Sequence, residues 1–122
     1  MGKLTESMET EPLEYHQQII EKAKNLIREN TQYKMSDIAL ACDISEATLY
    51  NIFKDKLKKT PNTVRQEIMC QKAADLLSTT NIKIEDISAQ TGFSSSSYFR
   101  KIFREYMNKT PKEYRKESKL IV

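Results

Sequence analysis

The sequence has little glycine, proline, cysteine or histidine. Its 122 residues include 2 Gly, 3 Pro, 2 Cys and 1 His. So few turn-forming residues are unlike the composition of a β-sandwich or barrel, and the 30% of charged residues favours helices. We therefore predict an all-α protein, either one compact body or two very small ones that share a helix.

The scarce cysteines and histidine also exclude several kinds of site. Cys42 and Cys70 lie far apart without a Cys-x-x-Cys motif, and His16 is the sole histidine, so a disulfide framework or a metal site is a poor interpretation. We expect both thiols to be buried small apolar groups, His16 to sit at the surface or on a helix flank, and no cofactor. Because no Gly-rich phosphate loop or group of nucleophile and base is apparent, we also expect no enzyme.

Long apolar runs and a strong net charge are absent as well. No run reaches the roughly 18 residues of a membrane span, and the start lacks the apolar stretch of a signal peptide, so we expect no membrane contact and a cytoplasmic protein.

The net charge of +3 is unevenly distributed along the chain: residues 100–122 carry +5, whereas residues 1–30 and 66–99 each carry −2. This distribution permits nucleic-acid binding, but taken alone it is better explained by a solvated basic face.

The first part of the chain contains one amphipathic segment. Residues 1–12 show no apolar periodicity, and we interpret them as a disordered lead or a cloning remnant; the domain itself then covers residues 13–122. From about Leu13 to Asn30 apolar residues recur at helical spacing. They are Ile19, Ile20, Ala23, Leu26 and Ile27.

The most informative feature is an internal repeat. The segment from Met35 to Pro61 returns about 50 residues later, from Ile84 to Pro111. The offset is 49 before the turn and 50 after it, so the second copy has one extra residue near the start of its second helix.

Each copy has the pattern of a helix-turn-helix unit, at about 35–57 and about 84–106. A short helix leads into a tight turn, in which Asp43 or Gly92 suits a left-handed backbone. Ser45 or Ser94 then stands where the N-cap of a longer helix belongs. A short helix, a tight turn and a capped longer helix together predict a helix-turn-helix.

Two further helices complete the expected set of about seven. Apolar positions between about 62 and 78 predict a long linker helix that packs against both units, and Pro111 is expected to start a last short helix that runs to about Glu117.

The exposed faces of the two longer helices carry side chains that suit a major groove. Small hydroxyls allow close approach, Arg can bind guanine at two atoms, Asn can pair with adenine, and Ala can touch a thymine methyl group. The candidate base-reading residues are Ala47, Tyr50 and Asn51 in the first copy and Ser96, Ser97, Arg100 and Lys101 in the second. For one helix alone an ordinary solvated face would be the better interpretation, but two such helices in matched contexts favour DNA binding.

Cations on these helices, and just after them, are candidates for phosphate contacts. Such contacts position a protein on DNA and supply salt-dependent affinity without reading sequence. The candidates are Lys54, Lys58, Lys59, Arg104, Lys109, Lys112 and Arg115.

These motifs resemble the AraC/XylS family of bacterial transcription regulators over roughly Tyr15 to Lys116. The second copy is most specific for the family. It carries Ile87, Gly92-Phe93-Ser94, Ser97-Tyr98-Phe99, Phe103, Thr110-Pro111 and Tyr114-Arg115. The first copy departs more, since Asp43 replaces the usual turn glycine, Lys58 a frequent glycine, and Met69 a usually basic residue.

The resemblance implies a homeodomain-like DNA-binding module with two helix-turn-helix units in successive major-groove segments of double-stranded DNA. It implies the same base-reading positions as the exposed faces, and a bacterial nucleoid location. It also implies a sensor or receiver domain elsewhere in a longer regulator, as in a YesN-like two-component response regulator, and RNA polymerase as a partner of an activator. The alternative is a helix-turn-helix scaffold that serves as a protein–protein adaptor, which would need an apolar patch on the reading faces.

Overall fold

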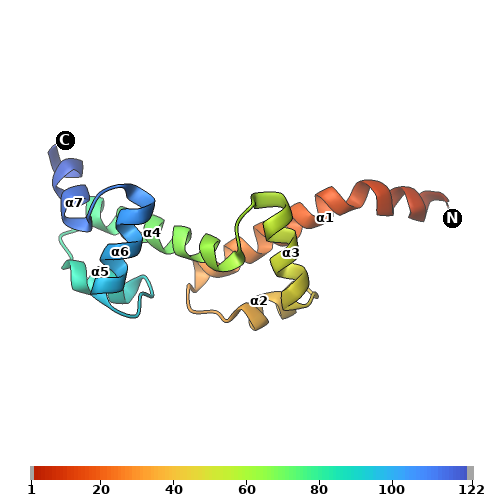
Figure 1. The fold of residues 1–122 in the computed structure, drawn as a ribbon, viewed down its shortest axis with the longest axis horizontal. Helices are drawn as coiled ribbons and strands as arrows, with labels where there is room; N and C mark the ends of the chain where they lie inside the picture. The colour runs from red at the N-terminus through yellow and green to blue at the C-terminus, as the bar shows by residue number, and fades with distance from the viewer. Residues whose placement is uncertain (1, 121–122) are drawn as a thin grey trace. The chain divides into compact units, whose positions relative to one another are not determined.

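The structure is a computed structural model that describes the backbone of residues 2–120 and the side chains of residues 14–119. Within this range the chain forms seven α-helices and no strand (Figure 1), which confirms the all-α prediction. The helices are α1 Gly2–Glu29, α2 Met35–Ala41, α3 Glu46–Leu57, α4 Pro61–Thr79, α5 Ile84–Gln90, α6 Ser96–Met107 and α7 Pro111–Leu120.

The chain divides into two compact units between Val64 and Arg65. The first unit contains α1, α2, α3 and the first turn of α4, and the second contains the rest of α4 with α5, α6 and α7. Each unit therefore holds one helix-turn-helix, and α4 is the linker helix that the sequence predicts.

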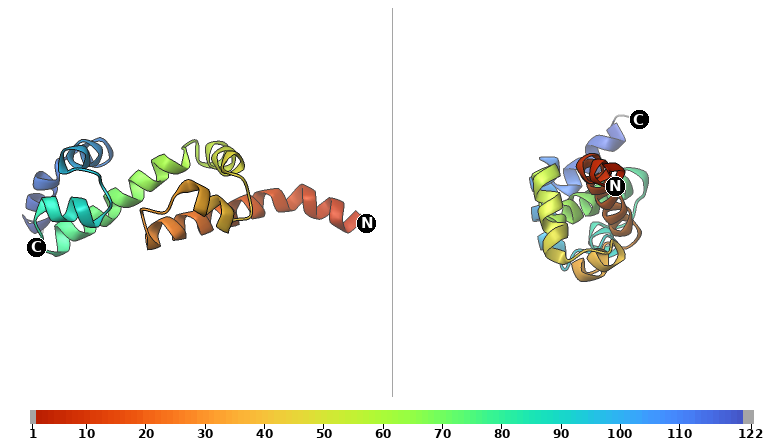
Figure 2. Two further views of the ribbon diagram at one scale, coloured as in Figure 1. Left: turned by 90° about the horizontal axis from the view of Figure 1, so that it is seen from below. Right: turned by 90° about the vertical axis from the view of Figure 1, so that its right-hand side faces the viewer.

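In the first unit, α1 packs against both α2 and α3 (Figures 1 and 2). Ile20 and Ile27 of α1 are fully buried, together with Ile38 of α2 and Phe53 of α3. The backbone helix starts at Gly2, earlier than the predicted start at residue 13. Residues 2–12, for which the sequence predicts a disordered lead, therefore belong to the backbone helix, and their side chains lie outside the described residues.

In the second unit, α4, α5 and α6 enclose a core of aliphatic and aromatic side chains. Its buried members are Met69, Cys70, Ala73, Ala74, Leu77, Ile87, Phe93, Phe99, Ile102 and Phe103. The ring of Phe103 meets that of Tyr114 edge to face, with centroids 5.5 Å apart, so α7 is joined to the same core.

Two Thr-Pro pairs start helices in equivalent places of the repeat. The hydroxyl of Thr60 accepts a hydrogen bond from the Thr63 amide at 3.0 Å, and Pro61 is the first residue of α4. The hydroxyl of Thr110 accepts from the Glu113 amide at 3.1 Å, while the Glu113 carboxylate accepts from the Thr110 amide at 2.8 Å. This reciprocal pair is a capping box, so each Thr-Pro is a helix start.

The N-cap of α6 corrects the sequence analysis. Ser45 caps α3 as predicted, because its hydroxyl accepts from the Thr48 amide at 3.1 Å. The cap of α6 is Ser95 rather than Ser94, with an equivalent 3.1 Å bond from the Tyr98 amide. Ser94 is therefore the extra residue of the second copy. Sequence alone could not separate two adjacent serines, because both can cap a helix.

Each longer helix ends at a residue in the left-handed region. Lys58 after α3 and Asn108 after α6 both have φ 59°, and the amide of each donates to the carbonyl four residues earlier. Both residues have a Cβ that crowds the following carbonyl, but the short polar side chain of Asn can hydrogen-bond locally, so Asn tolerates this conformation better than Lys. Lys58 is thus a strained helix end.

Replacing Lys58 by glycine should stabilise the first unit. We expect Lys58→Gly to raise the free energy of unfolding by about 1 kcal/mol, because glycine has no Cβ at this position. Lys58→Ala is the matched control, since it removes the same charge but keeps Cβ, and it should give no such gain. Urea unfolding followed by circular dichroism measures both, and equal effects of the two variants would contradict strain at this helix end.

Both cysteines are free and buried, as predicted. Burial is the main cause that raises the pKa of Cys70 to about 12, and the charge of Glu67 adds to it.

At pH 8 the native protein should therefore hold almost no Cys70 thiolate, which is the reactive form. We expect iodoacetamide to alkylate Cys70 at least ~100-fold more slowly in the native protein than in urea, as followed by mass spectrometry. Equal rates in both conditions would show that the thiol is accessible.

Candidate DNA interface

The exposed faces of α3 and α6 carry polar residues at matching positions. On α3 the side chains of Ala47, Tyr50 and Asn51 are exposed, and Tyr50 is 48% exposed. On α6 Ser97, Arg100 and Lys101 are exposed, and Ser96 is half-buried. The opposite faces are buried in both helices, through Leu49, Ile52 and Phe53 in α3 and Phe99, Ile102 and Phe103 in α6. On each of the two helices, the structure therefore places the predicted base-reading residues on one face.

The turn before each of these helices has the same hydrogen bonds in both units. The amide of Ile44 donates to the Ala39 carbonyl at 3.1 Å, and the amide of Phe93 donates to the Ser88 carbonyl at 3.0 Å. Between them the backbone passes through a residue at positive φ, Asp43 at 59° or Gly92 at 98°. The same turn thus sets the direction of both longer helices.

Side-chain hydrogen bonds tie α6 to α4 within the second unit. The Gln66 side-chain amide donates to the hydroxyl of Tyr98 at 2.8 Å, and the hydroxyl of Tyr106 donates to the Gln66 carbonyl oxygen at 3.4 Å. Partial burial raises the pKa of Tyr106, so its hydroxyl stays protonated and can donate. These bonds hold α6 at two points along its length.

Arg100 makes an ion pair with a residue of the short helix α5. Its Nη2 donates to Oε1 of Glu85 at 2.9 Å, across 15 residues of sequence. The pKa of the Glu85 carboxyl is lowered first by its own backbone amide and next by Arg100. Arg100 is thus held by a carboxylate while the side chain remains 46% exposed.

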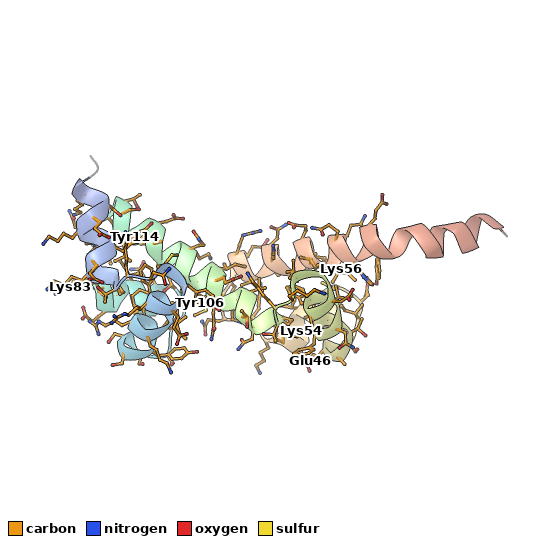
Figure 3. All side chains as sticks on the ribbon, turned by 45° about the horizontal axis from the view of Figure 1, so that its top comes forward. Glu46, Lys54, Lys56, Lys83, Tyr106 and Tyr114 are labelled. Carbon is orange, nitrogen blue, oxygen red and sulfur yellow. The ribbon has the colours of Figure 1, made fainter. Side chains whose placement is uncertain are left out.

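The predicted phosphate-contacting cations are exposed, with one exception described below. They are Lys54, Lys58, Lys59, Arg104, Lys109 and Lys112. Figure 3 labels Lys54 and Glu46, which both belong to α3. Lys58 and Lys109 contact groups of their own unit: the Lys58 ammonium donates to the Asp55 carbonyl at 2.9 Å, and the Lys109 ammonium lies 2.6 Å from the Glu117 carboxylate. The Glu117 partner raises the pKa of Lys109, which keeps its positive charge.

Arg115 differs from the other candidates, because it is half-buried and points toward the end of α4. Its Nε donates to the Leu77 carbonyl at 3.1 Å. A guanidinium at the C-terminal end of a helix satisfies a carbonyl that lacks an intrahelical partner and complements the helix dipole. This geometry favours a structural role for Arg115 over a phosphate contact.

Two acidic residues beside the predicted reading faces, Glu46 and Glu85, were not among the predicted site residues. Glu46 is exposed at the first position of α3, which corresponds to Ser96 of α6 at the offset of 50 residues. The repeat itself carries this signal, so a position-by-position alignment of the two copies would have found Glu46. No pattern in the sequence indicates that Glu85 contacts Arg100, because the pair forms only when α5 and α6 pack.

Within the described part of the chain, no three side chains of His, Cys, Asp or Glu gather as a metal ion would need. No described helix combines the length and apolar character needed to cross a bilayer.

Comparison with known proteins identifies the family. The helix-turn-helix domain family matches residues 41–117. The chain belongs to the AraC/XylS family of transcription regulators. It is the DNA-binding domain of this family, which is not an enzyme family.

Solved structures of AraC-type domains agree with this assignment. A transcriptional regulator of Chromobacterium violaceum with an AraC-type DNA-binding domain is 30% identical, with a TM-score of 0.80 over 84% of this chain and 93% of the other. The C-terminal domain of the two-component response regulator yesN from Fusobacterium nucleatum is 32% identical, with a TM-score of 0.69 over 78% of this chain and 95% of the other. The predicted two-unit, seven-helix fold is therefore confirmed.

The curated relatives are much longer proteins. Histidine kinase P4 of Formosa agariphila is 37% identical over 101 residues, which cover 80% of this chain and 7% of the kinase. The chain spans less than a third of the length of the curated relatives it matches.

Arg115 and its exposed neighbour Lys116 offer a test of the structural role. We expect Arg115→Ala to lower the free energy of unfolding by about 1.5–3 kcal/mol, the usual value of a hydrogen bond from a charged group. Lys116→Ala removes the same charge from an exposed position and should change stability by less than about 0.5 kcal/mol. Thermal unfolding measures both, and a stable Arg115→Ala protein with weaker DNA binding would instead favour a phosphate contact.

Proposed function

We propose that the chain binds specific double-stranded DNA sequences by placing the exposed faces of α3 and α6 in the major groove. One observation carries this proposal: the two helices present polar faces at equivalent positions, behind equivalent turns. Ser97 and Ala47 are small enough to let the backbone approach the bases, while Arg100 and Asn51 are long enough to reach base edges. The other proposed base-reading residues are Tyr50, Ser96 and Lys101.

Phosphate contacts supply most of the salt-dependent affinity in this proposal. The exposed cations Lys54, Lys58, Lys59, Arg104, Lys109 and Lys112 would neutralise phosphates on either side of the groove. Among the predicted phosphate contacts Arg115 has the least support, because its Nε already donates to the Leu77 carbonyl.

The two units differ in sequence, so one bound chain should read an asymmetric site. Two reading helices that enter successive major-groove segments would lie about one turn, ~34 Å, apart on the duplex. Selection of bound sequences from a random duplex library, at two salt concentrations, tests this directly. A two-part motif is the expected result, whereas no motif at either concentration would point to a protein–protein adaptor.

We further propose that this domain works within a longer bacterial regulator in the cytoplasm. The small share of the curated relatives that it covers, and the yesN C-terminal domain among its structural relatives, both favour attachment to a sensor or a receiver domain. RNA polymerase is then the partner expected of an activator that binds beside a promoter.

Arg100 and Lys112 should affect binding in different ways, although both carry one positive charge. If Arg100 reads a guanine, Arg100→Ala should cost about 1–3 kcal/mol on the preferred duplex and relax the preference at one base pair. Lys112→Ala should weaken binding to all sequences alike and lower the salt slope by about one unit. Fluorescence anisotropy with the preferred duplex and its single-base variants, at several salt concentrations, separates the two effects. An even loss on every duplex for Arg100→Ala would make Arg100 a phosphate contact.

A further inference from the structure

The ion pair between Glu85 and Arg100 links the short helix of the second unit to its reading face. Nη2 of Arg100 donates to Oε1 of Glu85 at 2.9 Å. This contact uses one of the five N–H donors of the guanidinium. A bidentate contact with guanine O6 and N7 needs two of the remaining donors. Arg100 can therefore keep its contact with Glu85 while it binds a guanine.

The same contact limits where else the Arg100 side chain can go. An arginine without a partner samples many rotamers and can turn toward a nearby phosphate, which adds affinity for any sequence. Glu85 lies on α5, and the turn bonds of Gly92 and Phe93 fix α5 relative to α6. Because Glu85 is itself anionic, it also disfavours a close approach of phosphate to this side of α6.

The first unit offers an internal comparison. At the repeat offsets, Ser36 stands where Glu85 is and Tyr50 stands where Arg100 is. A serine and a tyrosine do not form an ion pair of this kind, so this ion pair belongs to the second copy. The difference arises on a shared backbone, and it therefore reflects the side chains rather than the fold.

We infer that Glu85 is a specificity-determining residue that acts through Arg100, holding its guanidinium toward the base edges and away from the phosphates. The inference rests on the proposed base-reading role of Arg100. Removal of the Glu85 charge should raise affinity for unrelated duplexes and reduce the preference for the guanine that Arg100 reads.

The test compares Glu85→Gln with Asp86→Asn in the full chain. Both are near-isosteric, both remove one negative charge from the first turn of α5, and Asp86 is also exposed. The readout is the ratio of affinities for the preferred duplex and for the duplex changed at the base pair that Arg100→Ala relaxes. We expect Glu85→Gln to lower this ratio about two- to five-fold, the range of an exposed ion pair. Asp86→Asn should strengthen binding to both duplexes alike and leave the ratio unchanged.

A double variant separates this inference from the proposed function. In the Arg100→Ala background, adding Glu85→Gln should not change the ratio of affinities for the two duplexes any further, because Glu85 acts through Arg100. An unchanged ratio for Glu85→Gln alone, or an equal fall for Asp86→Asn, would overturn the inference while the base-reading role of Arg100 stands. If Arg100→Ala instead loses affinity evenly on all duplexes, the base-reading role itself fails. Circular dichroism of each variant confirms that it is folded.

Discussion

The arrangement of each unit depends on one residue that takes a positive φ between the two helices of the helix-turn-helix. Asp43 and Gly92 occupy this position, and the amide of the next residue donates back to the short helix, at 3.1 Å in the first unit and 3.0 Å in the second. Without this reversal the chain could not leave the short helix at an angle that lets the next helix pack against it. The burial of one face of α3 or α6, and hence the exposure of the other, follows from this turn.

Most of the fold could be predicted because local signals agree with the repeat. The Thr-Pro pairs at Thr60 and Thr110 mark helix starts in a way that depends only on nearby residues, and the structure has caps there. The apolar spacing of α3 and α6 likewise identifies the buried face, because helical periodicity alone decides which positions face inward. Ser95 was missed because a second serine precedes it, so the residue types did not distinguish between the two.

The parts that could not be predicted are contacts between distant segments. Arg115 belongs to a basic cluster in the sequence, yet its Nε binds the Leu77 carbonyl 38 residues earlier. Glu85 is one of two acidic residues in the first turn of α5, and only the packing of α5 against α6 brings it to Arg100. Charge patterns show which side chains are cationic, but tertiary structure decides which of them already have a partner.

In our proposal the same backbone unit carries two different recognition chemistries. In the first unit Tyr50 borders an apolar groove with Met35, Leu49 and Pro61. We expect Tyr50 to favour contacts with the shape of the DNA groove and with thymine methyl groups, and such contacts depend little on salt. In the second unit Arg100 forms an ion pair with Glu85, so its proposed contact with guanine would be directional and would cost more when the base is wrong. In this proposal an asymmetric DNA site follows from the side chains of the two copies, although their turns and caps are equivalent.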